Sequence, residues 1–210
     1  MAQVLKEDVQ RRMLKAAAQV FAERGFQSAT VAQIAGAAGV ATGNVYRYYE
    51  SKEVLFEAVV PAGMVRELSA LVRGRVRALA GTRDVRDAGR SAAWRLASEQ
   101  LIAFTIENRL ATVILLLPGR ADGTPHAGFS DRMVADLIGL AVEHASTVGI
   151  DFELDTVRRF ALRRIYRGLL GAMAAALLES DDGAVIRSMI DAFSSYHLAG
   201  MKAFLEGDRA

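Results

Sequence analysis

The chain has 210 residues, of which 52% are hydrophobic and 24% charged, with only three prolines. This composition is typical of an ordered globular protein and excludes a disordered one. Cysteine is absent, which excludes a disulfide framework and thiolate metal sites and is compatible with a reducing compartment.

Nothing in the sequence indicates export or a membrane span. Residues 1–12 are polar and charged, without the apolar core of a signal peptide. The longest apolar run, residues 111–117, is broken by Thr112 and is far shorter than the roughly 18 residues of a membrane span. We therefore expect a cytoplasmic protein with no membrane partner.

The net charge of +2 is unevenly placed along the chain. Residues 1–55 hold seven Lys and Arg against five Asp and Glu, whereas the remaining residues hold 19 of each sign. A basic N-terminal segment is a mild indication of a polyanionic partner such as nucleic acid.

Three short helices are predicted in the N-terminal quarter. The apolar residues of the first helix recur at helical spacing: Val9, Met13, Ala16, Ala17, Val20 and Phe21. We expect this helix to end at Gly25. Thr30 and Gln33 have the spacing of a capping box and open a second helix that stops at Gly39. A very short third helix is predicted at about 42–48, after which Ser51 caps the next helix.

The remaining sequence predicts longer helices and no strand. Breaks rich in Gly, Pro and Asp separate them, and we place the helices at about 52–80, 87–107, 110–117, 127–148, 155–179 and 183–205. The predicted fold class is all-α, with about nine helices.

Residues 27–55 have the pattern of a helix-turn-helix, because a capped helix, a glycine turn and a second short helix follow one another. Such a motif places its second helix in the major groove of DNA. Val45 and Tyr49 lie four residues apart and can face a small core with Ile34 and Val40. The rest of the short helix is then left toward solvent or DNA, including Thr42, Asn44, Arg47 and Tyr48.

These side chains have the chemistry of DNA recognition. Asn can pair with N6 and N7 of adenine and Arg with O6 and N7 of guanine, so Asn44 and Arg47 are candidate base contacts. A phosphate is an equally good partner for Arg47. Gly43 lets the backbone approach a phosphate, and Thr30 and Lys52 stand at helix N-termini, which favour phosphate. The alternative is an ordinary helical hairpin, which does not explain so short a helix carrying Asn, Arg and three Tyr.

Three short groups and one long segment carry a family resemblance: Thr30-Val31 with Ile34-Ala35, Ala38-Gly39-Val40, and the continuous stretch from Gly43 to Leu55. In this order they strongly resemble the TetR/AcrR family of bacterial regulators. The resemblance implies base or nearby phosphate contacts for Thr42, Asn44 and Tyr48. It also implies that the DNA backbone is held by Thr30, Gly43, Tyr46 and Lys52, with packing as the alternative role of Tyr46.

Two residues depart from the family pattern. Ala41 stands where the family has Ser at the start of the recognition helix, and Ala is a poor N-cap. Thr42 is the alternative cap, a role that would compete with its DNA contact. Tyr49 replaces a Phe, and its hydroxyl needs a partner if it is buried.

The resemblance implies two domains, a helix-turn-helix DNA-binding domain at 1–55 and a larger effector-binding and dimerisation domain at 56–210. A homodimer through residues about 155–205 is expected from small residues on one helix and an apolar stripe on the next. The small residues are Gly168, Gly171, Ala172, Ala175 and Ala176. The stripe comprises Ile186, Ile190, Phe193, His197, Met201 and Phe204. Packing within one chain is the alternative for the small residues.

The resemblance implies a cavity for a small-molecule effector in the second domain, and we choose its candidate contacts as mostly apolar with a few polar groups, as in binding pockets generally. The candidate contacts are Trp94, Leu101, Phe104, Asn108, His126, Phe129, Met133, Tyr166 and Met173. Leu115 and Leu137 are further apolar candidates, and Glu99 and Arg109 further polar ones. Each apolar candidate has the alternative of an ordinary core position.

Two other features have open interpretations. The Pro- and Gly-rich loop at 118–128 is either a mobile gate or a simple helix connection. A basic cluster on one predicted helix is expected to be a solvated face or to form salt links across a dimer, with a second DNA site as the alternative: Arg158, Arg159, Arg163, Arg164 and Arg167.

No enzyme is predicted. The three His are scattered without metal-ligand spacing, and neither a phosphate loop nor a nucleophile elbow is present, so we expect no metal and no cofactor. The predicted function is a repressor that binds a near-palindromic operator as a homodimer and is released by a small, lipophilic effector. The alternative is a DNA-binding protein without an effector, architectural or controlled by a partner; activation in place of repression also stays open.

Overall fold

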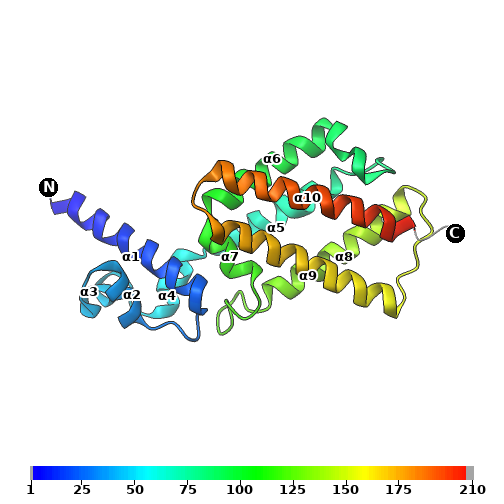
Figure 1. Ribbon diagram of the computed structural model, residues 1–210. Helices are drawn as coiled ribbons and strands as arrows, with labels where there is room; N and C mark the ends of the chain where they lie inside the picture. Colours follow the sequence, from blue (N-terminus) through cyan, green and yellow to red (C-terminus); the bar gives the residue numbers. More distant parts are fainter. Residues whose placement is uncertain (1, 207–210) are drawn as a thin grey trace. The chain divides into compact units, whose positions relative to one another are not determined.

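A computed structural model describes residues 2–206 of the chain, with the side chains from residue 7 onward. These residues form ten α-helices, one short 3-10 helix and no strand (Figure 1). The predicted all-α class is confirmed, with one α-helix more than the nine expected. None of the helices within this range has the length and apolar character of a membrane span.

The chain divides into two compact units whose limits differ from the predicted boundary at residues 55 and 56. The first unit comprises the residues up to Val65 together with Leu110–Phe129. The second comprises Arg66–Arg109 and the described residues from Ser130 onward. The boundary moves because the chain beyond residue 55 still packs with the N-terminal helices, as the contacts of Phe56 show.

Four helices build the N-terminal part of the first unit: α1 (Ala2–Arg24), α2 (Val31–Ala38), α3 (Thr42–Tyr48) and α4 (Lys52–Val59). Helix α1 packs against α2 and α4, and α3 packs against α2 (Figure 1). Phe21, Phe26 and Phe56 form a buried aromatic cluster, with the Phe56 ring centroid 5.2 Å from each of the other two. Edge-to-face contacts of this kind add to the free energy gained by burying the rings.

Local signals in the sequence set the ends of these helices. The predicted capping box is confirmed, since the Gln33 amide nitrogen donates to Thr30 Oγ1 at 3.2 Å and the Thr30 amide donates to Gln33 Oε1 at 3.0 Å. Gly39 ends α2 in the left-handed conformation, with φ of 66°. Ser51 accepts from the Val54 amide at 3.2 Å and caps α4 as predicted.

The prediction of a single helix at 52–80 is wrong. Helix α4 ends at Val59, and α5 begins at Ala62 and runs to Arg77. Pro61 lies between them and explains the break, because proline has no N–H to donate and excludes helical backbone at Val60. The helix predicted at 87–107 is also divided, into a 3-10 helix η1 (Val85–Arg90) and α6 (Ala92–Glu107), with the Ser91 side chain capping the latter.

The first unit also contains most of α7 (Arg109–Leu116) and the Pro- and Gly-rich loop that follows it. The Phe26 amide donates to the carbonyl oxygen of Arg120 at 2.8 Å. His126 is buried, with Nε2 3.1 Å from the carbonyl oxygen of Val60. The loop is therefore a packed connection that belongs to the N-terminal helices, and these contacts do not favour the gate interpretation.

The second unit is built from most of α5, η1, α6, α8 (Phe129–Thr147), α9 (Thr156–Glu179) and α10 (Gly183–Glu206). Helix α10 packs against α9, α6 and η1. Ion pairs between distant parts of the sequence join these elements, Lys202 with Asp84 at 2.9 Å and Arg187 with Glu99 at 2.7 Å. Helices α9 and α10 lie side by side in Figure 1.

Candidate functional site

Helix α3 buries one narrow edge and exposes the rest. Val45 is buried within the helix, and Tyr49 is buried directly after it, as predicted. Thr42, Gly43, Tyr46 and Arg47 are exposed, and Asn44 and Tyr48 are half-buried. Six predicted DNA contacts are therefore grouped on one seven-residue helix. Tyr46 is 52% exposed, which does not favour packing as its main role.

The exposed side of α3 combines a cation with aromatic and amide groups. The Arg47 guanidinium lies 5.5 Å from the centre of the Tyr48 ring. Stacking of this kind orients a guanidinium without using its N–H groups. Those N–H groups and the Asn44 amide can then donate to base edges or phosphate oxygens.

Lys52 has an internal role that the sequence did not reveal. Its ammonium donates to the carbonyl oxygens of Phe26 at 2.8 Å and Ala29 at 3.0 Å, and lies 4.4 Å from the centre of the Phe26 ring. These contacts tie the start of α4 to the turn before α2. The predicted phosphate contact of Lys52 stays a prediction, and the structure assigns the residue a positioning role.

The two departures from the family pattern have different outcomes. Ala41 is the N-cap of α3 without a side-chain bond, so Thr42 does not replace the missing cap, and that alternative is wrong. Within the described residues, the buried Tyr49 hydroxyl has no hydrogen-bond partner. An unmet buried hydroxyl costs about 1–3 kcal/mol, a local penalty next to α3.

Two neighbouring hollows of the second unit share part of their lining. We call the larger one the outer cleft: it has a volume of about 530 Å³ and is lined by residues of α5, α6 and α10, among them Ile102, Asp191 and Leu198. The smaller one, the inner cavity, has about 70 Å³ and is lined mainly by apolar side chains, including Leu79, Leu137 and Met201. Both hollows share Arg75, Trp94 and Leu198, so these three residues form the wall between them.

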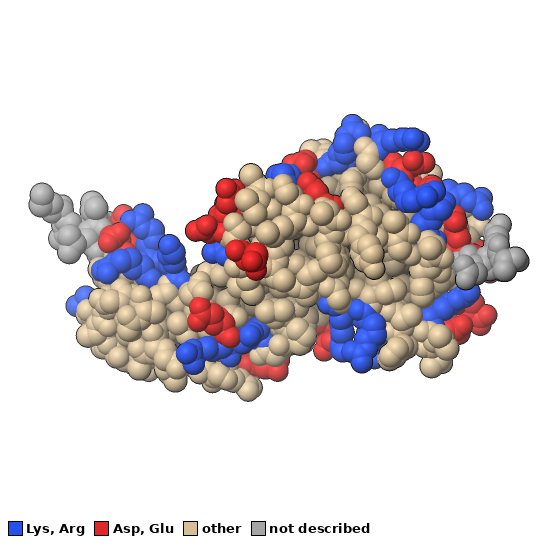
Figure 2. Space-filling model, in the orientation of Figure 1, with Lys and Arg blue, Asp and Glu red and all other residues tan. Residues whose placement is uncertain are grey.

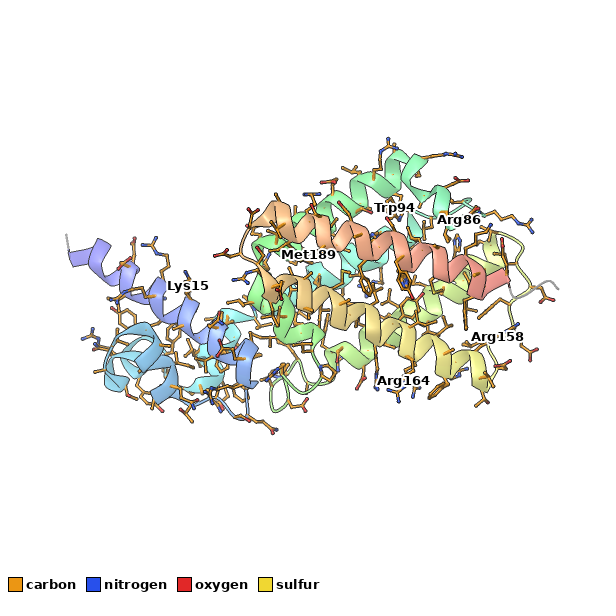
Figure 3. All side chains as sticks on the ribbon, viewed as in Figure 1. Lys15, Arg86, Trp94, Arg158, Arg164 and Met189 are labelled. Atoms are coloured by element: carbon orange, nitrogen blue, oxygen red, sulfur yellow. The ribbon has the colours of Figure 1, made fainter. Side chains whose placement is uncertain are left out.

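Arg75 is the central polar group of this wall. Its Nε donates to the buried Ser98 hydroxyl at 3.0 Å, and its guanidinium lies 4.8 Å from the centre of the Trp94 ring. Burial lowers the pKa of Arg75, while the charge of Asp191 raises it. Trp94 of α6, labelled in Figure 3, and Leu198 of α10 both pack against a buried cluster formed by Leu79, Val85 and Ala88.

The inner cavity also contains two imidazoles and a phenol. Burial and the charge of Arg75 lower the pKa of His197 to about 4, so this ring is neutral at pH 7. Its centre lies 5.5 Å from that of Tyr166, whose pKa is raised by burial. Burial lowers the pKa of His144 in spite of a hydrogen bond to the backbone of Thr82, and its Nε2 has no partner among the described residues.

The predicted effector contacts are dispersed. Trp94 lines both hollows and Tyr166 lines the inner cavity. His126 and Phe129 belong to the first unit. The remaining candidates are in the second unit but line neither hollow: Leu101, Phe104, Asn108, Met133 and Met173. The Asn108 amide donates to the Phe104 carbonyl of its own helix at 3.0 Å.

Arg75, His144 and His197 were not among the predicted contacts. Each occurs within an ordinary helical pattern, and no local motif marks it. Only the packing of α5, α8 and α10 brings the three to one cavity. The basic cluster on α9 has a local explanation in part, since Arg167 pairs with Asp131 of α8 at 2.6 Å.

The apolar stripe predicted on the last helix as a dimer face is wrong in most of its residues, because Ile186, Ile190 and Met201 are buried within the chain and His197 lines the inner cavity. A different apolar surface is exposed along α9 and α10. On α9, Val157 is 75% exposed and Phe160 63%, and on α10 Tyr196 is 74% exposed. Glycines and an alanine continue the exposed side of α9, where the Arg164 guanidinium also lies 5.5 Å from the centre of the Phe160 ring. On α10 an exposed stripe of uncharged residues runs beside the exposed Asp191: Val185, Ala192, Phe193, Tyr196, Ala199 and Ala203. Figure 2 shows this face of the two helices as largely uncharged.

Comparison with known proteins finds similarity concentrated in the N-terminal segment. Residues 13–59 match the family described as bacterial regulatory proteins, tetR family. The HTH-type transcriptional repressor KstR2 is 42% identical over 48 residues in both Rhodococcus jostii (strain RHA1) and Mycolicibacterium smegmatis (strain ATCC 700084 / mc(2)155). The match covers 23% of this chain and 24% and 23% of those proteins, so it spans about a quarter of their length.

Among solved structures, the chain is similar to a proposed tetR family transcription regulator from Shewanella sp. PV-4. The sequence identity is 20%, and the superposition covers 94% of this chain and 96% of that one with a TM-score of 0.37.

Proposed function

We propose, on the premise that the chain belongs to the TetR family of bacterial regulatory proteins, that it is a DNA-binding repressor released by a small molecule. The observation that carries the proposal is helix α3, which lies within the matched segment 13–59 and exposes Thr42, Gly43, Tyr46 and Arg47 on one side. The two curated relatives that match this segment are named repressors, which favours repression over activation.

In this proposal α3 is the recognition helix. Asn44 and Arg47 read base edges, and Thr42, Tyr46 and Tyr48 contact bases or phosphates next to them. A Cβ at Gly43 would meet no protein atom within 4 Å, so packing inside the protein does not require glycine at this position. Without a side chain, Gly43 lets the DNA backbone approach the helix closely. Thr30 and Lys52 hold the ends of α2 and α4, so that the backbone around α3 keeps its shape.

The DNA-bound form is a homodimer through α9 and α10, the region predicted at about 155–205. The exposed apolar stripes on these two helices support this, because monomeric proteins rarely expose large contiguous apolar patches. Two copies of the stripes would form a four-helix bundle with the small residues at its centre. The dimer would carry two recognition helices about 34–36 Å apart, one turn of DNA, and match a near-palindromic operator.

Release by the effector requires coupling between the second unit and α3. The chain passes between the units after Val65, Arg109 and Phe129, so α5, α7 and α8 are the elements that can transmit a change. The continuous helix predicted at 52–80 would have been a single connection of this kind, but α4 ends at Val59. A coupling free energy of about 1–3 kcal/mol is typical of such control.

The alternative is a DNA-binding protein that responds to a partner or acts architecturally. The outer cleft and inner cavity favour an effector, because together they offer apolar walls and unmet polar atoms in one place.

The proposal is tested by selecting bound sequences from a random DNA duplex pool at near-physiological salt. We expect one palindrome to be enriched and to bind a dimer. Asn44→Ala should then weaken binding to that palindrome at least tenfold, since a good bidentate pair contributes about 1–3 kcal/mol of discrimination. Arg24→Ala, which removes an exposed cation of α1 in the same unit, is the control and should change affinity much less. Salt-sensitive binding without an enriched sequence would favour the architectural alternative.

A further inference from the structure

We infer that the second unit binds an amphiphilic carboxylate, with the carboxylate on the Arg75 guanidinium and the apolar body in the outer cleft. The inference rests on the proposed function, of which it specifies the class of effector. It depends on the hydrogen bonds of Arg75, the charges around it and the shape of the cleft.

Most of the hydrogen-bond donors of the Arg75 guanidinium are not used by the protein. Its Nε donates to the neutral Ser98 hydroxyl, and the Trp94 ring covers one face of the guanidinium. In the described part of the chain neither terminal nitrogen makes a hydrogen bond, and the half-buried Arg75 side chain lines the outer cleft. A guanidinium fork offers two parallel N–H groups that match a carboxylate.

The other charges of the cleft are either engaged or too far from Arg75. Glu99 pairs with Arg187 at 2.7 Å, and Arg95 donates to the carbonyl oxygens of Gly89 and Arg90 at 2.8 and 3.1 Å. Asp191 attracts Arg75 electrostatically, but no ion pair within 4.0 Å joins them in the described part of the chain. His197 is neutral at pH 7, so it adds no second positive charge next to Arg75.

A partly buried cation without an anion is costly, because burial penalises its charge. This penalty is visible in the lowered pKa of Arg75. A ligand carboxylate would remove the penalty at the point where the wall separates the outer cleft from the inner cavity. The site therefore selects for negative charge at one end of its ligand.

The shape of the cleft selects for an apolar body. Its volume of about 530 Å³ lies within the range of small-molecule sites, roughly 300–1,000 Å³. Ala92, Trp94, Leu96, Ile102 and Leu198 provide its apolar surface. The inner cavity, at about 70 Å³, has room for only the end of a chain, since one water occupies about 30 Å³ in the liquid.

Trp94 provides a direct measurement, because it is the only tryptophan of the chain and lies against Arg75. Decanoate and decanol are titrated into the full-length protein without DNA, below their aggregation concentrations, while Trp94 emission is recorded. We expect a saturable change with decanoate at a Kd at least tenfold below that for decanol. Equal affinity for the two, or no saturable change with decanoate, would overturn the inference.

Three variants locate the carboxylate. Arg75→Met should reduce decanoate affinity to that of decanol, whereas Arg95→Met removes an equal charge from the same cleft and should leave it unchanged. Asp191→Asn removes a repelling charge and should tighten decanoate binding severalfold; weaker binding would contradict an anionic ligand. Circular dichroism checks the folding of each variant, and the wild-type comparison of decanoate with decanol decides the matter if Arg75→Met unfolds.

The outcome is independent of the DNA experiment. Failure to bind decanoate with a palindrome still selected by a dimer would reject this effector class and leave the proposed repressor intact. Decanoate binding without any DNA binding would reject the proposed function and leave a carboxylate-binding unit.

Discussion

Each of the two units of this protein is stabilised by a different kind of internal contact. In the first, the helices on either side of α3 begin with local caps, Thr30 with Gln33 and Ser51 with Val54, in addition to the aromatic cluster around Phe56. In the second, the joining contacts span long stretches of sequence, such as Lys202 with Asp84 and Arg109 with the carbonyl of Leu177 at 2.7 Å. The first is the unit whose segment matches known proteins, and the second has the cavities.

This difference explains what each unit can do. A DNA surface has one fixed target shape, so a motif defined by local caps and turns can be shared among many proteins. An effector cavity needs only a closed shell of helices, and its chemistry depends on which side chains packing brings inside. In the proposed function, the residues that line the hollows of the second unit would set which ligand is bound.

The largest expected effect is a loss of stability when the aromatic cluster of the first unit is disrupted. Phe56→Ala should lower the free energy of unfolding by about 3–5 kcal/mol, because a buried ring in contact with Phe21 and Phe26 is removed. Urea unfolding followed by circular dichroism measures the loss. Leu96→Ala, at a 61% exposed position, is the control and should change stability by less than about 0.5 kcal/mol. Hydrogen exchange should show lost protection in the first unit; equal loss in both units would contradict their separate packing.

The second effect concerns the proposed dimer. Phe160→Glu should raise the dimer dissociation constant at least 100-fold, about 2.7 kcal/mol, because it buries a charge in an apolar contact. Sedimentation velocity over a range of concentrations measures it. Leu96→Glu places the same charge at another exposed apolar position, on α6, and should leave the dimer intact. A Phe160→Glu protein that stays dimeric would exclude this part of α9 from the interface.

The third effect is a pH dependence of the second unit. The pKa of His197 is about 4 in the folded chain and near 6.5 when unfolded, so the unfolded state binds more protons between these values. Stability is therefore full above pH 6.5 and falls as the pH is lowered toward 4, by about 2 kcal/mol for this half-buried ring. Urea unfolding at a series of pH values should show a smaller fall in His197→Gln than in the wild type. Identical slopes in the two proteins would contradict the assignment.

The smallest expected effect is the change in stability when the N-caps of α2 and α3 are altered. Ala41 has extended backbone at the N-cap of α3 and makes no capping bond, so Ala41→Ser should stabilise the unit by about 1 kcal/mol. Thr30→Ala, which removes an existing cap, should destabilise it by a similar amount. Thermal unfolding compares the two variants. No gain from Ala41→Ser would show that the start of α3 is held by other contacts.

Much of the first unit could be predicted from the sequence. The caps at Thr30, Gly39 and Ser51 and the burial of Val45 follow from patterns within four residues, and all were found. Lys52 was interpreted only as a phosphate contact, because its two carbonyl partners lie 23 and 26 residues away. The helix across Pro61 was predicted from its apolar pattern, which continues on both sides of the break.

The sequence by itself determined that this chain is helical, where α3 begins and ends, and which side chains of α3 are left outside the core. Those features depend on hydrogen bonds and periodicities within a few residues. Only the tertiary structure decided that the 118–128 loop packs with the N-terminal helices and that Arg75, His144 and His197 meet at one cavity. Those residues come from helices far apart in sequence, and the free energy that brings them together is that of packing, which leaves no local pattern.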